Sequence, residues 1–335
     1  MMSRFLVFFL SLGIMGCSLN NGPVENVSEG GALGTSYRLI YITETESDFK
    51  TEIDSVFAAI NKSLSTYISD SDISKINKGD STLVIDAMFD DVFVLSKDVY
   101  QKTNGYFDPT VGTLVNAWGF GPEEQIAMDS TRVDSLLEFV GFDKVCITDN
   151  GTVEKENPNI YFDFNAIAKG YAIDRLAHMM DSKGVQNYLL EVGGELVAKG
   201  ENIIKDKSWV VGIDDPEMGV TRELKKLIYL KDRALASSGN YRKFRIDEAT
   251  GKRYVHTIDP KTGFTKNGNT LAATVLANTC AKADAYATAF MAMDLDDSFK
   301  LLSQLKELEG YIIYIDENGT TQEFMTEGFE DLVVK

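Results

Sequence analysis

The fold is decided by residues 271–293, which read LAATVLANTCAKADAYATAFMAM. Residues 271–276 form a short β-rich run, and an alanine-rich run of helical periodicity follows from Thr279. The apolar stripe of this helix consists of Ala283, Tyr286, Ala287 and Phe290. A strand that leads directly into a helix with a buried face is typical of a fold in which helices cover a sheet.

Strand and helix patterns alternate on both sides of this segment. The β-rich runs, separated by glycine or charged turns, are Tyr37–Ile42, Tyr188–Val192, Trp209–Ile213, Leu227–Leu230, Tyr241–Ile246 and Arg253–Thr257, with a final hairpin that pairs Tyr311–Ile315 with Thr321–Met325. Helical patterns cover Phe49–Leu64, Asp90–Thr103, Ser130–Val140 and Asp296–Glu307. The mixture predicts an α+β fold with mixed or antiparallel sheets and packed helices. Only 6 prolines occur, so we expect two intimately packed subdomains in one compact unit.

Composition excludes several classes of protein. The 335 residues are 44% hydrophobic and 25% charged, as in globular domains. The 51 acidic and 33 basic residues give a net charge of −18, which argues against a nucleic-acid partner. The 3 cysteines form no Cys-x-x-Cys pair and there are 2 histidines, which excludes a zinc finger or a disulfide scaffold. We expect Cys146 and Cys280 to be buried free thiols.

The N-terminus has the pattern of a bacterial lipoprotein signal. An apolar run follows Arg4 and ends in Ile14-Met15-Gly16-Cys17, which resembles a lipobox. The alternative is an ordinary signal peptide with an incidental cysteine. We expect a signal peptide over 1–16, a lipidated Cys17 and a flexible tether over 17–30, and one domain over 31–330. The mature chain is then extracytoplasmic, on the periplasmic side, and attached to a bacterial membrane by its lipid.

Two segments have polar residues at predicted turns. Asp108-Pro109 is a turn signal, and Thr110 is placed to cap the helix after it, although an ordinary turn and aromatic core explain the same pattern. A strand over Ile160–Phe162 ends at Asp163, where a helix begins. The free backbone N–H groups of such a helix start favour a bound phosphate, and Lys169 in the first turn adds positive charge.

Two further segments contain candidates for acid–base chemistry and metal binding. His256 precedes an Asp-Pro turn, where it is either a structural residue or a proton-transfer group; His178 is read as structural. Asp284 and Thr288 are four residues apart, so the carboxylate of Asp284 and the hydroxyl of Thr288 lie on one helix face. They suit Mg²⁺ completed by a substrate phosphate, or simply bond to each other on an exposed face.

Together these segments resemble one family. The motifs are Gly34-Thr35-x-Tyr37, Ser65-Thr66-Tyr67, Phe107-Asp108-Pro109-Thr110-Val111-Gly112, Trp118-Gly119-Phe120-Gly121, Ala168-Lys169-Gly170-Tyr171-Ala172, Val192-Gly193-Gly194, Ser237-Ser238-Gly239-x-Tyr241, His256-x-Ile258-Asp259-Pro260-x-Thr262-Gly263 and Ala283-Asp284-Ala285-x-Ala287-Thr288-Ala289. In this order they resemble the ApbE-type flavin transferases, the FAD:protein FMN transferases, over residues 31–325.

The resemblance implies an activity and partners. FAD binds with Mg²⁺, a threonine or serine hydroxyl of an acceptor protein takes the FMN moiety, and AMP is released. Acceptors carry an Asp-Gly-x-Ser/Thr-Gly-Ala-Ser/Thr-type motif and include flavoprotein subunits of sodium-pumping NADH:quinone reductases and RNF-type complexes. The alternatives are an Mg-dependent FAD pyrophosphatase, which forms FMN and AMP, and a non-catalytic flavin-binding lipoprotein.

The resemblance also implies roles for single residues. Asp284, Thr288 and the backbone carbonyl of Ala166 match the Mg²⁺ ligands, and His256 matches the residue that assists deprotonation of the acceptor hydroxyl. The positions that match flavin or nucleotide contacts are Leu33, Tyr67, Asp108, Pro109, Thr110, Asp163, Lys169 and Ile258.

Overall fold

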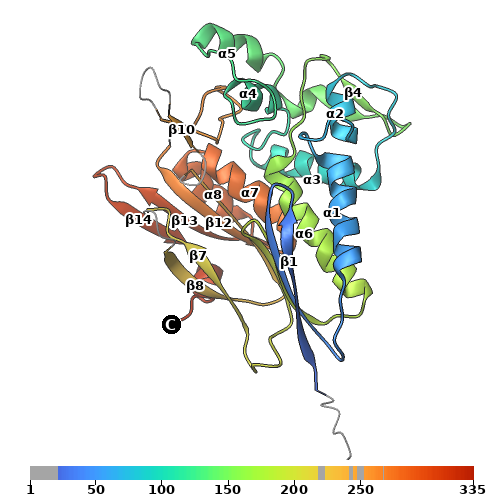
Figure 1. Ribbon diagram of the computed structural model, residues 1–335. Coiled ribbons are helices and arrows are strands. Elements are labelled where there is room, and N and C mark those ends of the chain that lie inside the picture. Colours follow the sequence, from blue (N-terminus) through green and yellow to red (C-terminus); the bar gives the residue numbers. More distant parts are fainter. Residues whose placement is uncertain (1–21, 218–222, 241–243, 247–252, 267) are drawn as a thin grey trace, which may run out of the picture.

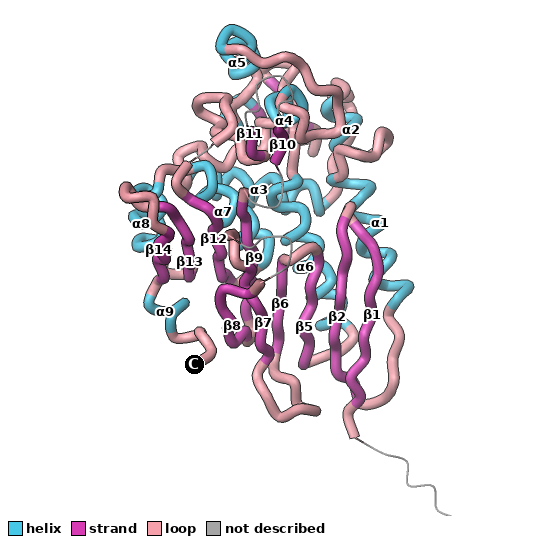
Figure 2. The backbone as a smooth tube through the Cα atoms, turned by 60° about the vertical axis from the view of Figure 1, so that its left-hand side comes forward, coloured by secondary structure: helices cyan, strands magenta, loops and turns pink. Residues whose placement is uncertain are grey.

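An antiparallel sheet of eight strands organises the molecule (Figures 1 and 2). In this computed structural model, residues 22–335 are described except 218–222, 241–243, 247–252 and 267. Across the sheet the strands are β1 (Val24–Ala32), β2 (Thr35–Thr43), β5 (Asn187–Val192), β6 (Glu195–Lys199), β9 (Arg233–Gly239), β12 (Thr270–Ala277), β13 (Glu309–Ile315) and β14 (Thr321–Met325). Every neighbouring pair is antiparallel.

Helices cover one face of this sheet. They are α1 (Lys50–Leu64), α3 (Ala87–Lys102), α6 (Asn165–Ser182), α7 (Cys280–Ala292) and α8 (Leu295–Gln304). Figure 1 shows α6 and α7 lying across the strands, and α7 packs on β9 and β12 while α6 packs on β5 and β6. The apolar side chains between these layers form the main core of the described chain.

A small sheet covers the other face. It pairs β7 (Trp209–Asp214) with β8 (Leu224–Leu230), and its inner side chains, such as Trp209 and Ile228, pack on the eight-stranded sheet. The remaining elements gather above the sheet in Figure 2. They are α2 (Asp72–Asn77), α4 (Gly112–Ala117), α5 (Ser130–Leu137), a 3₁₀ turn (Phe142–Lys144), β3 (Val145–Ile147), β4 (Val153–Lys155), β10 (Phe244–Ile246) and β11 (Arg253–Val255); α9 (Glu327–Glu330) lies near the C-terminus.

The α+β expectation is confirmed, and most elements lie within a few residues of their predicted ranges. Local capping explains several helix starts: Asp86 Oδ1 accepts from Phe89 N at 2.9 Å, and Asp129 Oδ1 accepts from Arg132 N at 2.8 Å. Residues 241–243 of the predicted strand Tyr241–Ile246 lie outside the described residues, as do residues 1–21 with Cys17. In the part of the chain that is described, no helix is long and apolar enough to cross a membrane.

The tether predicted for residues 17–30 is wrong from Val24 onward, because Val24–Ala32 is strand β1. Its polar composition conceals this role. Asn26 is buried and donates to Thr43 Oγ1 at 2.7 Å, and buried Ser28 lies 3.4 Å from the hydroxyl of Tyr41. Pairing with β2 supplies hydrogen-bond partners that a composition argument cannot foresee.

The predicted strand Ile160–Phe162 is also wrong. Only Tyr161 makes a bridge, to Val111. The Asn77 side chain takes the place of a partner strand: its Nδ2 donates to Phe162 O at 2.9 Å, and its Oδ1 accepts from Phe162 N at 2.7 Å. The strands β6 and β9 were not predicted. The pattern of β9 is weak because it consists mainly of small residues that lack a strand-like alternation.

Two local expectations need correction. Thr110 does not cap α4: the N-cap is Val111, without a side-chain bond, and Thr110 Oγ1 instead donates to Asp108 Oδ1 at 2.6 Å. Cys280 is a buried free thiol as expected, whereas Cys146 is free but exposed. Cys146 is the middle residue of β3, between buried Val145 and half-buried Ile147, and its side chain points to the outer face of that strand.

Candidate active site

The site is built where helices α6 and α7 cross at close range. Gly170 in α6 permits the approach, since a Cβ there would lie 2.4 Å from the carbonyl oxygen of Cys280. The backbone N–H of Gly170 donates to Oδ2 of Asp284 in α7 at 3.2 Å. Helical geometry directs the carbonyl of Ala166, one turn earlier in α6, toward the same N–H. Two of the predicted metal ligands, Ala166 and Asp284, therefore converge on one amide.

Thr288 supplies the next group on α7. It lies one turn after Asp284, and its Oγ1 is 3.4 Å from the hydroxyl of Ser238 on β9. Asp284 is 3% exposed, so the alternative of an Asp–Thr bond on an exposed helix face is excluded. The pair faces α6 and β9 inside the protein.

Negative charge exceeds positive charge around Asp284. Burial raises the pKa of Asp284. The positive charge of nearby Lys169 lowers this pKa, and the negative charge of Glu195 raises it. Lys169 forms a salt bridge with Glu195, whose side chain is 3% exposed. Burial opposes the charge of Lys169, but Asp284 and Glu195 together raise its pKa. Lys169 is therefore a charged group held beside the crossing rather than a free surface lysine.

This donor set fits Mg²⁺. Among the described residues, Oε2 of Glu195 is buried without a hydrogen-bond partner, although Oε1 of the same carboxylate pairs with Lys169. No group of three or more His, Cys, Asp or Glu side chains in that part of the chain could enclose a metal. A carboxylate, a hydroxyl and a carbonyl are the few hard ligands that Mg²⁺ takes when substrate phosphate completes its shell.

The Asp108-Pro109-Thr110 segment forms a buried turn joined to the start of α6. Asp108 Oδ1 accepts from Thr110 N at 2.8 Å, and Thr110 Oγ1 accepts from Gly141 N at 2.7 Å. The carbonyl of Pro109 accepts from Asp163 N at 2.8 Å. Burial raises the pKa of Asp108 to about 6, although the Thr110 bonds lower it. The turn and Asp163 are thus positioned as one unit.

The other predicted flavin contacts lie around this unit in different environments. Tyr67 is 61% exposed, and partial burial followed by the charge of Asp163 raises its pKa. Leu33 occupies the β1–β2 turn at φ 52° and packs on both helical cores. Ile258 is buried against Trp118, whose Nε1 donates to Gly263 O at 2.8 Å. Tyr67 offers an exposed aromatic ring, and Ile258 an apolar wall.

His256 is connected to the α7 pair through β9. It follows β11, and its neighbour Thr257 donates to Asn240 Oδ1 at 2.8 Å. Asn240 comes two residues after Ser238, which contacts Thr288. The segment that contains His256 is thereby joined to the end of β9, two residues from the serine that contacts Thr288. His178 lies on α6 as an exposed residue and takes no part.

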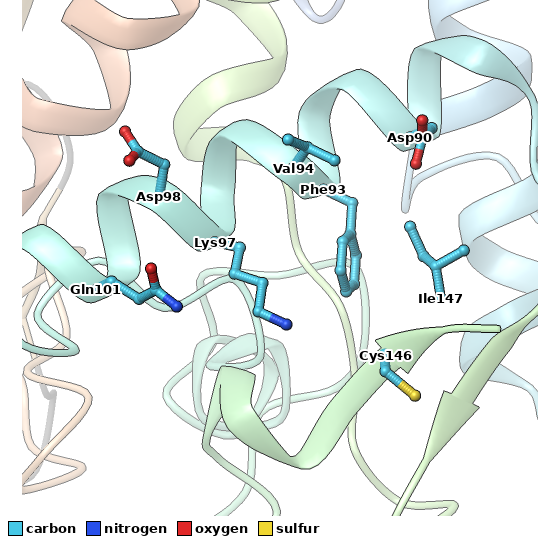
Figure 3. A pocket seen from close by; sticks show the side chains of 8 residues that line it. All are labelled: Asp90, Phe93, Val94, Lys97, Asp98, Gln101, Cys146 and Ile147. Carbon is cyan, nitrogen blue, oxygen red and sulfur yellow. The ribbon is translucent and has the colours of Figure 1, made fainter. Parts of the chain in front are cut away.

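One surface hollow lies away from this site. It measures about 410 Å³ and lies on the outer side of α3, lined by residues that include Phe93, Lys97 and Cys146 (Figure 3). It contains none of the predicted site residues. The contacts of Gly170 and Ser238 and the ion pair of Glu195 were not predicted from the sequence. Only the close spacing of small residues in 166–172 hinted at the helix crossing.

Most of the chain is similar to known proteins. A family model described as the ApbE family matches residues 33–312. The chain is 32% identical to the FAD:protein FMN transferase of Haemophilus influenzae, covering 95% of this chain and 94% of that protein. It is 34% identical to the FAD:protein FMN transferase of Vibrio cholerae, covering 87% and 88%.

Solved structures give the same result for the fold. The flavin transferase ApbE from Vibrio cholerae superposes with a TM-score of 0.82 at 31% identity, covering 92% of this chain and 99% of that one. The ApbE protein from Thermotoga maritima superposes with a TM-score of 0.81 at 27% identity, covering 93% and 100%. The fold implied by the sequence resemblance is confirmed.

Proposed function

The chain belongs to the ApbE family, and from that premise we propose that it transfers the FMN moiety of FAD to a threonine or serine hydroxyl of an acceptor protein. One observation carries this proposal: Asp284 accepts from the Gly170 amide where α6 and α7 cross, and Thr288 lies one helical turn away on α7. This is a site for a hard cation and a pyrophosphate, beside the start of a helix.

The reaction balances without a further reactant. The acceptor oxygen forms a bond to the FMN phosphorus, and the bond from that phosphorus to the bridging oxygen breaks. AMP leaves with that oxygen, and His256 takes the proton of the hydroxyl. Phosphoryl transfer depends on charge neutralisation and in-line placement more than on covalent help. We propose that Lys169, whose charge lies beside Asp284 and Glu195, also meets phosphate oxygens.

We propose Mg²⁺ as the metal, held by Asp284, Thr288 and the Ala166 carbonyl. When bound, it neutralises charge on the phosphate oxygens. The flavin is proposed to lie against Tyr67, Leu33 and Ile258, while the buried turn Asp108-Pro109-Thr110 and Asp163 orient it. The exposed ring of Tyr67 is available for stacking, which supports this placement.

The acceptor and the location are proposals of the same kind. We propose acceptors with an Asp-Gly-x-Ser/Thr-Gly-Ala-Ser/Thr-type motif, such as flavoprotein subunits of sodium-pumping NADH:quinone reductases or RNF-type complexes. We also propose that Cys17 is lipidated after removal of residues 1–16, which attaches the protein to a bacterial membrane on the periplasmic side. The lipobox-like Ile14-Met15-Gly16-Cys17 supports the anchor. Conversion of Cys17 to Ser should release the protein from the membrane fraction, and retention there would contradict the anchor.

The transferase test uses a soluble form that begins at Ser18. It is incubated with FAD, Mg²⁺ and an acceptor domain that carries the threonine motif. Flavin fluorescence on the acceptor band after denaturing electrophoresis measures transfer, and AMP is assayed in the same sample. Thr288→Val, which removes the hydroxyl, should lower transfer at least ~10-fold at limiting Mg²⁺. Thr288→Ser, which keeps the hydroxyl, is the matched control.

Each outcome has a distinct meaning. A labelled band that disappears with EDTA or with His256→Ala supports the transferase. AMP and FMN without a labelled band on any motif-bearing acceptor would favour the pyrophosphatase. Bound FAD with neither product would leave the flavin-binding lipoprotein.

A further inference from the structure

Asp174 joins the two helices at a second point. It lies on α6, one turn after Gly170, and is partly buried. Its Oδ1 accepts from the backbone N–H of Cys280 at 2.7 Å, and its Oδ2 accepts from that of Ala281 at 2.8 Å. Both carboxylate oxygens are therefore used on the first two residues of α7.

These two hydrogen bonds cap the N-terminus of α7, which has no side-chain cap from its own N-cap residue. Thr279 is its N-cap in extended geometry, but the Thr279 side chain makes no capping hydrogen bond. A carboxylate at a helix start satisfies N–H groups that have no partner within the helix and interacts favourably with the helix dipole. Because this carboxylate comes from α6, the cap also fixes how α7 is rotated about its axis and how far it is shifted along α6.

The position of the metal ligands depends on that register. Asp284 lies one turn and Thr288 two turns beyond the capped residues, whereas the Ala166 carbonyl belongs to α6. A rotation or slide of α7 on α6 would move two of the ligands away from the third. The Gly170–Asp284 contact at 3.2 Å is long for an N–H···O bond and fixes the register less strongly than the two shorter Asp174 bonds.

We propose that Asp174 is a positioning residue for the metal site, which holds α7 so that Asp284 and Thr288 meet the Ala166 carbonyl. This inference rests on the proposed Mg²⁺ site and deepens it. It concerns metal affinity, and so it is separable from the identity of the acceptor.

The test measures metal binding directly. Free Mn²⁺ is followed by electron paramagnetic resonance during titration of the Ser18–Lys335 protein with FAD present, so that phosphate can complete the metal shell. Asp284→Ala under the same conditions defines the binding due to surface carboxylates and free FAD. Asp174→Asn keeps the side-chain volume but leaves one oxygen to accept a bond. We expect it to weaken the Asp284-dependent Mn²⁺ binding about 10-fold, because one of the two charge-assisted bonds that hold α7 against α6 is lost. Asp181→Asn is the matched control, because Asp181 lies on the same helix and bonds Tyr188 and Lys199 instead.

A second variant separates positioning from helix stability and serves if Asp174→Asn folds poorly. Thr279→Asp, added to Asp174→Asn, gives α7 a cap of its own at an exposed position but does not restore the tie to α6. We expect the double variant to regain melting temperature while Mn²⁺ binding stays weak. Recovery of both would overturn the inference, as would wild-type Mn²⁺ affinity in Asp174→Asn. If the wild-type protein shows no Asp284-dependent binding, the metal site itself fails, whatever the transfer assay shows.

Discussion

The backbone N–H of Gly170 and the carboxylate of Asp284, 114 residues apart in the chain, lie 3.2 Å from each other. This contact joins the first turns of α6 to the middle of α7. It is possible only because residue 170 has no side chain, as the carbonyl of Cys280 occupies the space that a Cβ would need. The glycine therefore has a structural role that its helical setting does not suggest.

Gly170→Ala should be destabilising although alanine is the better helix former. Helix propensity alone favours the alanine by about 1 kcal/mol. The new Cβ would lie 2.4 Å from Cys280 O, and overpacking of this kind costs about 1–3 kcal/mol or more. Urea unfolding should show a net loss of stability. Titration with Mn²⁺ should show weaker metal binding. Gly31→Ala is the control, since its nearest atom is Thr35 O at 3.7 Å. A more stable Gly170→Ala protein would contradict the close crossing.

Lys169 and Glu195 should be coupled in stability. Lys169→Met leaves the carboxylate of Glu195, 3% exposed, without its cation and next to Asp284. We expect a loss of about 1–3 kcal/mol, below the range for fully buried pairs because the Lys169 side chain is 32% exposed. Glu195→Gln in the same protein should recover part of that loss. A double-mutant cycle by urea unfolding that shows additivity would contradict the coupling.

Asp108 should make the protein less stable as pH rises from 4 to 6. Burial raises its folded-state pKa from 3.8 to about 6, so the folded protein keeps this proton after the unfolded chain has lost it. The loss in free energy of unfolding grows between the two pKa values and stays constant above pH 6. It is on the order of 3 kcal/mol at most. Unfolding in urea without FAD checks this: the wild-type protein should lose stability relative to Asp108→Asn from pH 4 to 6. Parallel curves would contradict the shift.

Tyr67 should contribute to flavin binding through its ring rather than its hydroxyl. Tyr67 is 61% exposed, so little packing within the protein is lost when its ring is removed. Tyr67→Ala should weaken FAD binding about 3- to 10-fold, the range expected for one aromatic stacking contact. Tyr67→Phe keeps the ring and should bind FAD like the wild type. Quenching of flavin fluorescence measures both dissociation constants. Equal affinity for all three proteins would remove Tyr67 from the flavin site.

The sequence predicted the parts of the site that depend on local pattern. The helical spacing of Asp284 and Thr288 placed both oxygens on one face, and the structure keeps them on α7. The turn at Asp108-Pro109 was also predicted, but not the bonding of Thr110, because its partner Gly141 lies 31 residues away. The resemblance of ordered motifs, rather than any single motif, indicated the family.

Periodicity and turn residues therefore determined the α+β class and most of the elements, since these depend on neighbours within a few positions. The site residues were predicted from the order of the motifs. The tertiary structure alone decided that β1 belongs to the sheet, that Asn77 replaces a partner strand for Phe162, and that Glu195 holds Lys169. It also decided that Gly170 and Asp174 set α7 against α6. These contacts join residues far apart in the chain, and their energies depend on burial and distance, which only the folded arrangement defines.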